Sequence, residues 1–181
     1  MHFAPDTEEI LRFAVALVDT HPAATRSGLD ELDRAGLRRI FEDYTYTGRF
    51  DQDEREVAEV RETRDLIKRV WTMPTDEQVQ QVNAMLRDAG ALPYLTKHDH
   101  YDWHLHATAP DAPLAERMRV EFAIAFADVI RSGATDRMRE CEADNCEGLV
   151  LDLSRNGSKR FCSVRCGNRM NQLAFRSRAT E

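Results

Sequence analysis

The four cysteines of the chain are the residues whose spacing points most directly to chemistry. Cys141, Cys146, Cys162 and Cys166 form a C-x4-C-x15-C-x3-C pattern, and the rest of the 181 residues contains no cysteine. Two close pairs separated by a spacer are how a chain brings four thiolates to one tetrahedral zinc ion. Because four thiolates leave no open coordination position for water or substrate, the pattern predicts one structural zinc ion per chain.

Two other interpretations of the cysteines are disulfide pairs and unrelated buried cysteines. The N-terminus lacks the basic and apolar regions of a signal peptide, which predicts a cytoplasmic, reducing location where disulfides are rare. Unrelated core cysteines would not be expected to cluster in one stretch. No apolar run approaches the roughly 20 residues that span a membrane, so we expect a soluble protein without a membrane partner.

The elements that position these cysteines are predicted between and after them. Residues 148–153 alternate in the manner of a half-buried strand. The Asn-Gly pair at 156–157 is typical of the two positive-φ positions of a tight hairpin turn, after which residues 159–161 would run back as a strand. Ser163 is expected to open a helix with Cys166 in its first turn. This combination predicts a small treble-clef-like zinc-binding α+β module.

Charge is distributed unevenly along the chain, whose net charge is −7. Residues 1–136 contain 16 basic and 26 acidic residues, whereas residues 137–181 contain 9 basic and 6 acidic residues. Residues 153–180 contain seven basic residues and no acidic one. An acidic body with a basic tail favours a polyanion as the partner of the tail, although a solvated basic face is the alternative.

Basic side chains recur on one side of the expected C-terminal helix, because Arg165, Arg169 and Arg176 are four and seven residues apart. The hairpin tip and its return strand carry further basic residues. The predicted DNA-binding residues are Arg155, Lys159, Arg160, Arg165, Asn168, Arg169, Arg176 and Arg178. The Asn168 amide would either read an adenine edge or bond the zinc loop. Met170, Leu173 and Ala174 are expected to face the protein.

The N-terminal part, residues 1–135, is predicted to be a mainly helical domain with a small β-hairpin. Apolar stripes at helical spacing and their stop signals place helices at residues 6–19, from Asp33 through Tyr44, from the acidic run 51–54 to just before Pro74, from Thr75 to Gly90, and from Pro113 to Gly133. The last of these is the most apolar and is expected to form the centre of the core. Asp33 is expected to be the N-cap of its helix, and Thr75 and Gln78 have the spacing of a capping box.

A change of period between residues 91 and 108 predicts the hairpin. Residues 93–95 and the alternating run 101–107 would be its strands. His104 and His106 would share one face, as part of a second metal site or, alternatively, of a polar sheet face.

Polar groups set among apolar residues predict a small-molecule effector site. It would be formed by Asp19, Thr20, His104 and His106, near the C-terminal end of the first helix and the hairpin. The alternative for Asp19 and Thr20 is that they hold the neighbouring loop through backbone hydrogen bonds.

Cys166-Gly-Asn-Arg169, the upstream C-x4-C pair and the segment at residues 153–162 resemble the CGNR zinc-finger family over roughly residues 138–178. The resemblance implies that a finger at residues 136–181 follows an α-helical ABATE domain. Leu-Val-Asp-Thr at residues 17–20 is similar to the L-x-N-T of that domain, with Asp19 in place of asparagine. The family is described as a stress-related bacterial transcription regulator.

The functional hypothesis is therefore a DNA-binding transcriptional regulator whose zinc finger contacts DNA. Its helical domain would act as a sensor for a small-molecule effector or as a homodimerisation unit. An enzyme is not expected, because the sequence has no Gly-rich phosphate loop, no G-x-S-x-G and no paired-histidine zinc motif. The alternatives are a zinc-finger adaptor between proteins and an RNA-binding protein, since basic charge does not distinguish the nucleic acids.

Overall fold

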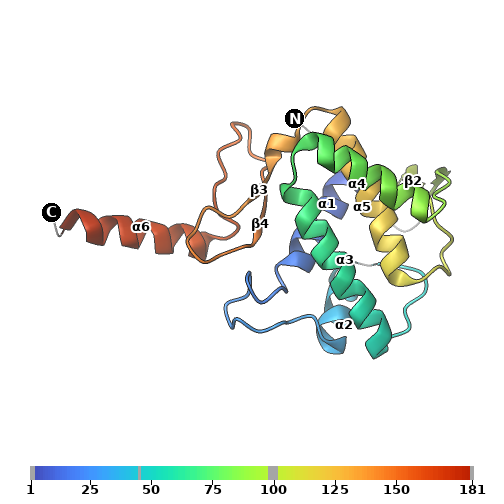
Figure 1. Ribbon diagram of the computed structural model, residues 1–181, viewed down its shortest axis with the longest axis horizontal. Coiled ribbons are helices and arrows are strands. Elements are labelled where there is room, and N and C mark those ends of the chain that lie inside the picture. Colours follow the sequence, from blue (N-terminus) through green and yellow to red (C-terminus); the bar gives the residue numbers. More distant parts are fainter. Residues whose placement is uncertain (1–2, 45, 98–101, 180–181) are drawn as a thin grey trace.

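The computed structural model describes residues 3–44, 46–97 and 102–179. Its helices are α1 (Pro5–Val18), α2 (Arg34–Asp43), α3 (Glu54–Thr72), α4 (Thr75–Asp88), α5 (Leu114–Arg131) and α6 (Val164–Ala179), with a 3-10 turn η1 (Thr135–Arg137). Its strands are β1 (Tyr94–Thr96), β2 (His104–His106), β3 (Met138–Glu140) and β4 (Leu149–Leu151). The predicted fold class is confirmed: a mainly helical body with a small hairpin precedes a C-terminal α+β module (Figure 1).

Aspartate side chains begin two of the helices as N-caps. Asp33 Oδ1 accepts a hydrogen bond from the Gly36 amide at 2.7 Å, and Asp53 Oδ1 accepts one from the Glu56 amide at 2.8 Å. Each bond satisfies an amide that has no partner inside the first turn of its helix. The cap predicted at Asp33 is therefore confirmed.

The capping box predicted at the start of α4 is wrong. Pro74 is the N-cap residue and makes no side-chain cap. The Thr75 hydroxyl instead lies 3.3 Å from that of Thr135, and the buried Gln78 amide donates to the Val70 carbonyl at 3.0 Å. Because α3 ends directly before α4, the free carbonyls at its C-terminus take the Gln78 side chain.

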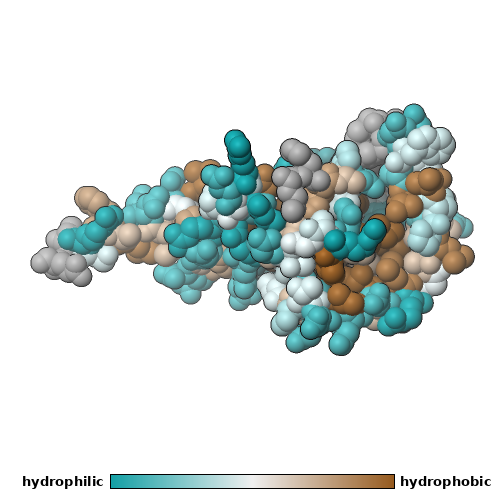
Figure 2. Space-filling model, turned by 90° about the horizontal axis from the view of Figure 1, so that it is seen from above, coloured by the Kyte–Doolittle hydropathy of each residue, from teal (hydrophilic) through white to brown (hydrophobic). Residues whose placement is uncertain are grey.

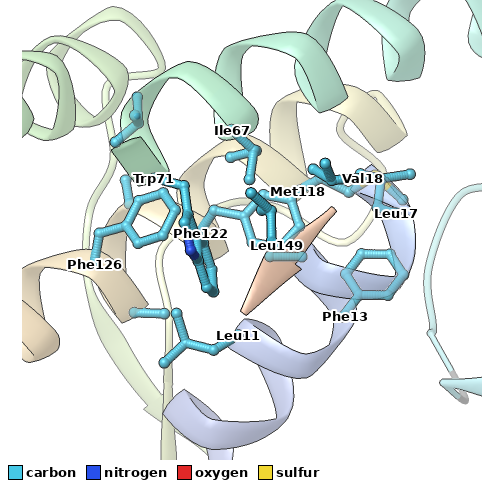
Figure 3. Close-up of a cluster of buried hydrophobic side chains, with 14 of the residues drawn as sticks. Leu11, Phe13, Leu17, Val18, Ile67, Trp71, Met118, Phe122, Phe126 and Leu149 are labelled. Carbon is cyan, nitrogen blue, oxygen red and sulfur yellow. The ribbon is translucent and has the colours of Figure 1, made fainter. Parts of the chain in front are cut away.

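Helix α5 forms the centre of the core, as its composition predicts. Its Phe122 ring stacks on Phe13 of α1 with 5.6 Å between centroids, and its Phe126 ring meets Trp71 of α3 edge-on at 6.0 Å. These rings are almost fully buried (Figure 3). At roughly 1.5–3 kcal/mol for each large apolar side chain removed from water, such contacts hold α1 and α3 against α5.

Strands β3 and β4 of the C-terminal module complete the same core. They pair antiparallel, with Met138 opposite Leu151. Leu149 is fully buried and lies among the helical core residues in Figure 3. The Trp71 indole donates a hydrogen bond to the Arg139 carbonyl at 3.1 Å. The zinc module is therefore packed against the helices.

The strand predicted at residues 148–153 is shorter and more buried than expected. Its apolar face, with Leu149 and Leu151, joins the helical core, while Val150 on the other face packs with the cysteines. Its hairpin partner is β3 on its N-terminal side, and residues 159–161 are not a strand. The strand is more buried because the helical core supplies a second layer, which a half-buried strand pattern does not reveal.

The turn predicted at residues 156–157 is also different. Gly157 has a positive φ of 62°, whereas Asn156 is not among the positive-φ residues. The Asp152 carboxylate organises this segment by accepting hydrogen bonds from the Ser154 amide at 2.9 Å and the Lys159 amide at 2.8 Å. A buried side chain therefore takes the place of strand pairing.

The division predicted between residues 135 and 136 falls inside η1, which runs directly into β3. Helices and strands on the two sides of that position share one apolar cluster. The division of the chain into two domains at this boundary therefore stays a prediction. In the described part of the chain, no helix has the length and apolarity needed to cross a membrane.

Candidate metal centre

Local structure on both sides of the cysteines brings the two pairs together. Directly after β3, the Cys141 amide donates to the Gly148 carbonyl at 2.8 Å, and Asn145 takes a left-handed conformation with φ of 56°. This closes the loop between β3 and β4 around the first pair. At the second pair, the Ser163 hydroxyl accepts a hydrogen bond from the Cys166 amide at 3.3 Å, so Cys166 lies in the first turn of α6 as predicted.

The sulfur atoms have the spacing that one zinc ion requires. The Sγ atoms of Cys146, Cys162 and Cys166 are 3.7 Å from one another, and all four cysteine sulfurs lie within 4.8 Å of one another. A tetrahedron with zinc–sulfur bonds of about 2.3 Å has edges of about 3.8 Å. The donor set and its geometry therefore fit a structural zinc ion held by Cys141, Cys146, Cys162 and Cys166.

The predicted effector residue Asp19 lies against this centre. A Cβ atom placed on Gly148 would be 3.1 Å from Asp19 Oδ1 and 3.1 Å from Cys162 Sγ, so a side chain there would crowd both groups. Burial raises the pKa of Asp19 to about 6, although the Lys159 charge and a Leu149 backbone hydrogen bond oppose the rise. Asp19 therefore marks the contact between the end of α1 and the zinc module.

Thr20 has a structural role, in agreement with the alternative stated above. Its hydroxyl donates to the Leu17 carbonyl at 2.6 Å and accepts from Arg64 Nη1 at 3.2 Å. The same guanidinium forms two hydrogen bonds with the Asp30 carboxylate, at 2.7 and 3.0 Å. Together these contacts hold the loop after α1 against α3.

The basic residues before α6 differ in how tightly they are held. Arg160 forms an ion pair with Glu142 at 2.6 Å. Lys159 Nζ donates to the Leu151 carbonyl at 3.3 Å. Arg155 is exposed, and its side chain makes no hydrogen bond or ion pair with any residue that the structure describes.

The Asp152 carboxylate fixes the backbone that carries these basic residues. Its side chain is fully buried and bonds the Arg139 guanidinium. Burial would raise the pKa of Asp152, but hydrogen bonds from Ser154 and Lys159 and the Arg139 charge lower it to about 2. Asp152 is therefore ionised near neutral pH, and the sequence pattern gave no sign of this role.

One of the predicted residues on α6 is bonded to the cysteine module. The Arg169 guanidinium donates to the Asp144 carbonyl of the first cysteine loop. Asn168 is exposed, and among the described residues it has no hydrogen-bond partner. Farther along, Arg176 is exposed, and Arg178 Nε donates to the Ala174 carbonyl at 3.0 Å.

Two of the three residues expected to face the protein do not do so. Met170 packs against the cysteine cluster, but Leu173 is 44% exposed and Ala174 is exposed. The reason is that α6 continues away from the body after its first two turns (Figure 1). Apolar residues at helical spacing predict one apolar face of a helix, but they do not show how far along the helix the rest of the protein covers that face.

A basic hollow joins α6 to the helical body. Arg26, Arg165 and Arg169 line one open hollow of about 310 Å³ beside Cys146 and Cys166. A hydrogen bond of 3.0 Å from the Glu147 amide to the Ala23 carbonyl fixes the loop that carries Arg26. Arg26 was not among the predicted residues, because nothing in its local sequence links it to the cysteine module.

A second cavity lies at the opposite end of α1. It has a volume of about 120 Å³ and is enclosed by α1, α5, β2 and the segment after α2. His104 and His106 line it, whereas Asp19 and Thr20 do not. The structure therefore brings together only two of the four predicted effector residues.

The two histidines face inward as a hydrogen-bonded pair. Their Nε2 atoms are 3.0 Å apart, and His104 Nδ1 lies 2.8 Å from the Asp102 carbonyl. Because a carbonyl only accepts, His104 Nδ1 donates to it, and one of the two Nε2 atoms donates to the other. The outward face of the hairpin carries Trp103 and Leu105, which are 68% and 43% exposed. His104 and His106 therefore share one face of the hairpin, as predicted, and both are half-buried there.

The cysteines are the only cluster of three or more potential metal ligands within residues 3–44, 46–97 and 102–179. His98 and His100, from the predicted histidine cluster, lie outside the described residues.

Comparison with known proteins gives two family matches. A model described as "Putative stress-induced transcription regulator" (ABATE) matches residues 6–133, and a model of the CGNR zinc finger matches residues 137–179. Both are of regulator or zinc-finger type. No curated protein matches the chain.

Proposed function

The chain belongs to the ABATE family, which is described as "Putative stress-induced transcription regulator", and on that premise we propose that it regulates transcription by binding DNA through its zinc module. The observation that carries this proposal is the hollow lined by Arg26, Arg165 and Arg169. Three arginines that line one opening supply the positive charge, and a guanidinium has the planar donor geometry, that backbone phosphates attract.

The body and the module contribute to this surface together. Arg26 comes from the loop after α1, and Arg165 and Arg169 come from the first two turns of α6. Zinc would fix the start of α6 relative to that loop, because two of its ligands flank the first turn. The backbone that carries the three arginines would then already be ordered before DNA binds, so binding would lose less conformational entropy than binding by a flexible tail.

Helix α6 is the proposed element that enters a DNA groove. Its 16 residues correspond to about 24 Å of helix, and it projects from the body (Figure 1). The major groove of B-DNA admits an α-helix. Exposed Asn168 and Arg176 would contact bases or phosphates there, with Arg178 on the adjoining side. Arg155, Lys159 and Arg160 would contact phosphates next to the helix.

The helical body is proposed to act as the sensor. Its cavity is enclosed by α1 and α5, and α1 also reaches the zinc module at Asp19 and Gly148. A change at the cavity can therefore reach the metal centre through one continuous helix.

A protein-interaction role is the second candidate, because α6 also exposes large apolar side chains. Val164 is 81% exposed and Phe175 is 70% exposed. Figure 2 shows that the narrow arm carries apolar as well as hydrophilic residues. A second copy of this chain is one partner that would cover them.

Salt-dependent binding tests the proposal. We expect the zinc-loaded protein to bind duplex DNA with a logarithmic affinity that falls linearly with the logarithm of salt concentration. Arg26→Ala should reduce that slope by about 0.9, which corresponds to one phosphate contact. Arg87→Ala, which removes an exposed arginine from α4, is the control and should leave the slope unchanged. RNA binding with equal affinity would support the RNA alternative.

A further inference from the structure

The cavity between α1, α5 and β2 has the walls of a ligand site. We propose that it binds a small organic cation, a protonated amine or guanidine with a short apolar body. The proposal depends on the cavity alone and holds whether or not the protein binds DNA.

Three carboxylates give the cavity its charge. Asp6, Glu9 and Glu121 all line it. Asp6 and Glu9 make no hydrogen bond or ion pair with any other residue in the described ranges, although both are partly buried. The Tyr46 hydroxyl donates to Glu121. Burial, and then the charge of Glu121, raises the pKa of Tyr46 well above its ordinary value, so Tyr46 remains a neutral donor.

The one arginine of the cavity is committed to the backbone. Arg117 is 4% exposed, and its Nε donates to the Ala112 carbonyl at 3.1 Å. Its two terminal nitrogens donate to the carbonyls of Thr47 and Arg49. Each of the three guanidinium nitrogens therefore donates to a backbone carbonyl, so Arg117 holds the chain after α2.

The histidine pair adds little positive charge. A hydrogen bond between the two Nε2 atoms requires one of them to be unprotonated, so the pair carries at most one positive charge. Among the described residues that line the cavity, three carboxylates therefore face one guanidinium and at most one imidazolium. This excess of negative charge favours a cationic ligand over an anionic one.

Aromatic and apolar side chains form the rest of the wall. Phe13 and Tyr44 come from α1 and the end of α2, and Ile10 and Ile124 lie between them. Aromatic faces attract an organic cation and also cover its apolar body. A volume of about 120 Å³ is well below the roughly 300–1,000 Å³ of pockets for drug-sized ligands. The ligand is therefore small.

A matched series of probes tests the charge preference. Benzylamine, benzyl alcohol and benzoate have similar shapes and carry positive, zero and negative charge at pH 7.5. Titration calorimetry on the full-length, zinc-loaded protein should show benzylamine binding at least about tenfold more tightly than either of the others. Glu9→Gln and Glu121→Gln should each weaken benzylamine binding by about tenfold and leave benzyl alcohol binding unchanged.

Glu77→Gln is the control, because it removes an exposed carboxylate of α4 that does not line the cavity. Its benzylamine affinity should equal that of the wild type. Should Glu121→Gln fail to fold, the probe series and Glu9→Gln still decide the matter. Equal binding of the three probes, stronger binding of benzoate or the absence of benzylamine binding would overturn the proposal. An unchanged benzylamine affinity in Glu9→Gln would also overturn it.

Discussion

The two parts of the zinc module differ sharply in what surrounds them. Strands β3 and β4 are packed into the helical body, where Leu149 and Val150 are fully buried. Helix α6 leaves the body after Met170, and every residue from 171 to 178 is exposed. The four cysteines lie between these two parts. This difference indicates that the metal centre joins a fixed support to a projecting arm.

Different interactions stabilise the β3–β4 pair and helix α6. Apolar burial holds β3 and β4, because Leu149 lies in the same cluster as the core of α1, α3 and α5. The start of α6 contributes Cys166 and Met170 to a separate, small cluster around the cysteines. Zinc coordination should therefore contribute most of the stability of α6 and little of that of β4.

The largest expected effect comes from Cys162→Ser. It removes one thiolate, so zinc should be lost, and residues 153–178 should loosen while α1–α5 and β3–β4 stay folded. Elemental analysis and hydrogen exchange would measure both changes. Full zinc content in this variant would contradict the assignment of Cys162 as a ligand. Faster hydrogen exchange throughout α5 would contradict the claim that zinc stabilises α6 and core burial stabilises β3 and β4.

The second comparison sets Leu149 against Leu173. Leu149→Ala should destabilise the whole protein by about 3 kcal/mol, because a fully buried leucine leaves a cavity in the shared core. Leu173→Ala, on the exposed part of α6, should change the free energy of unfolding by less than about 0.5 kcal/mol. Denaturant unfolding measures both. Similar losses in the free energy of unfolding for the two variants would contradict the claim that β4 is held by the core and the end of α6 is not.

Asp152→Asn should have an intermediate effect. It keeps the size of a fully buried side chain but removes the charge that bonds Arg139 and the amides of Ser154 and Lys159. We expect a loss of about 2 kcal/mol in stability and greater exchange of the amides at residues 154–159. Asp136→Asn, at an exposed aspartate, is the matched control. Equal stability of the two variants would show that Asp152 does not hold this segment.

Much of this architecture follows from sequence periodicity and spacing. The helices, the cap at Asp33 and the position of Cys166 on α6 depend on local rules, and these were predicted correctly. The pairing of β4 with β3 was missed, because residues 138–140 carry no strand pattern of their own. The same limitation applies to Leu173, whose exposure depends on where the neighbouring body ends.

In the candidate sites too, residues close in sequence were predicted correctly, whereas residues brought together from distant segments were not. The cysteine spacing predicted the metal centre, but Arg26 joins it only through a contact between distant segments. Asp19 and His104 were grouped by their polarity, and the structure places them at opposite ends of α1. Glu121 and Tyr46 were missed, because their pairing in the cavity spans 75 residues of sequence.

The smallest expected effect is that of Asn168→Ala. The side chain is exposed and has no hydrogen-bond partner in the described part of the chain. We therefore expect zinc content and stability to stay unchanged, while preference for a DNA sequence falls by about 1 kcal/mol or more. Selection of bound sequences with the wild type and this variant checks this. Loss of zinc would instead assign Asn168 to the metal loop.

The most direct test is DNA affinity measured over a range of salt concentrations on one protein preparation, before and after zinc is removed by a chelator. The account predicts salt-sensitive binding by the zinc-loaded protein, with a slope near −3 if the three arginines of the hollow each contact one phosphate at roughly −0.9. Removal of zinc should abolish most of this binding, because α6 loses its fixed position. Absence of salt-sensitive DNA binding at low ionic strength, together with capture of a protein partner through residues 138–178, would contradict it.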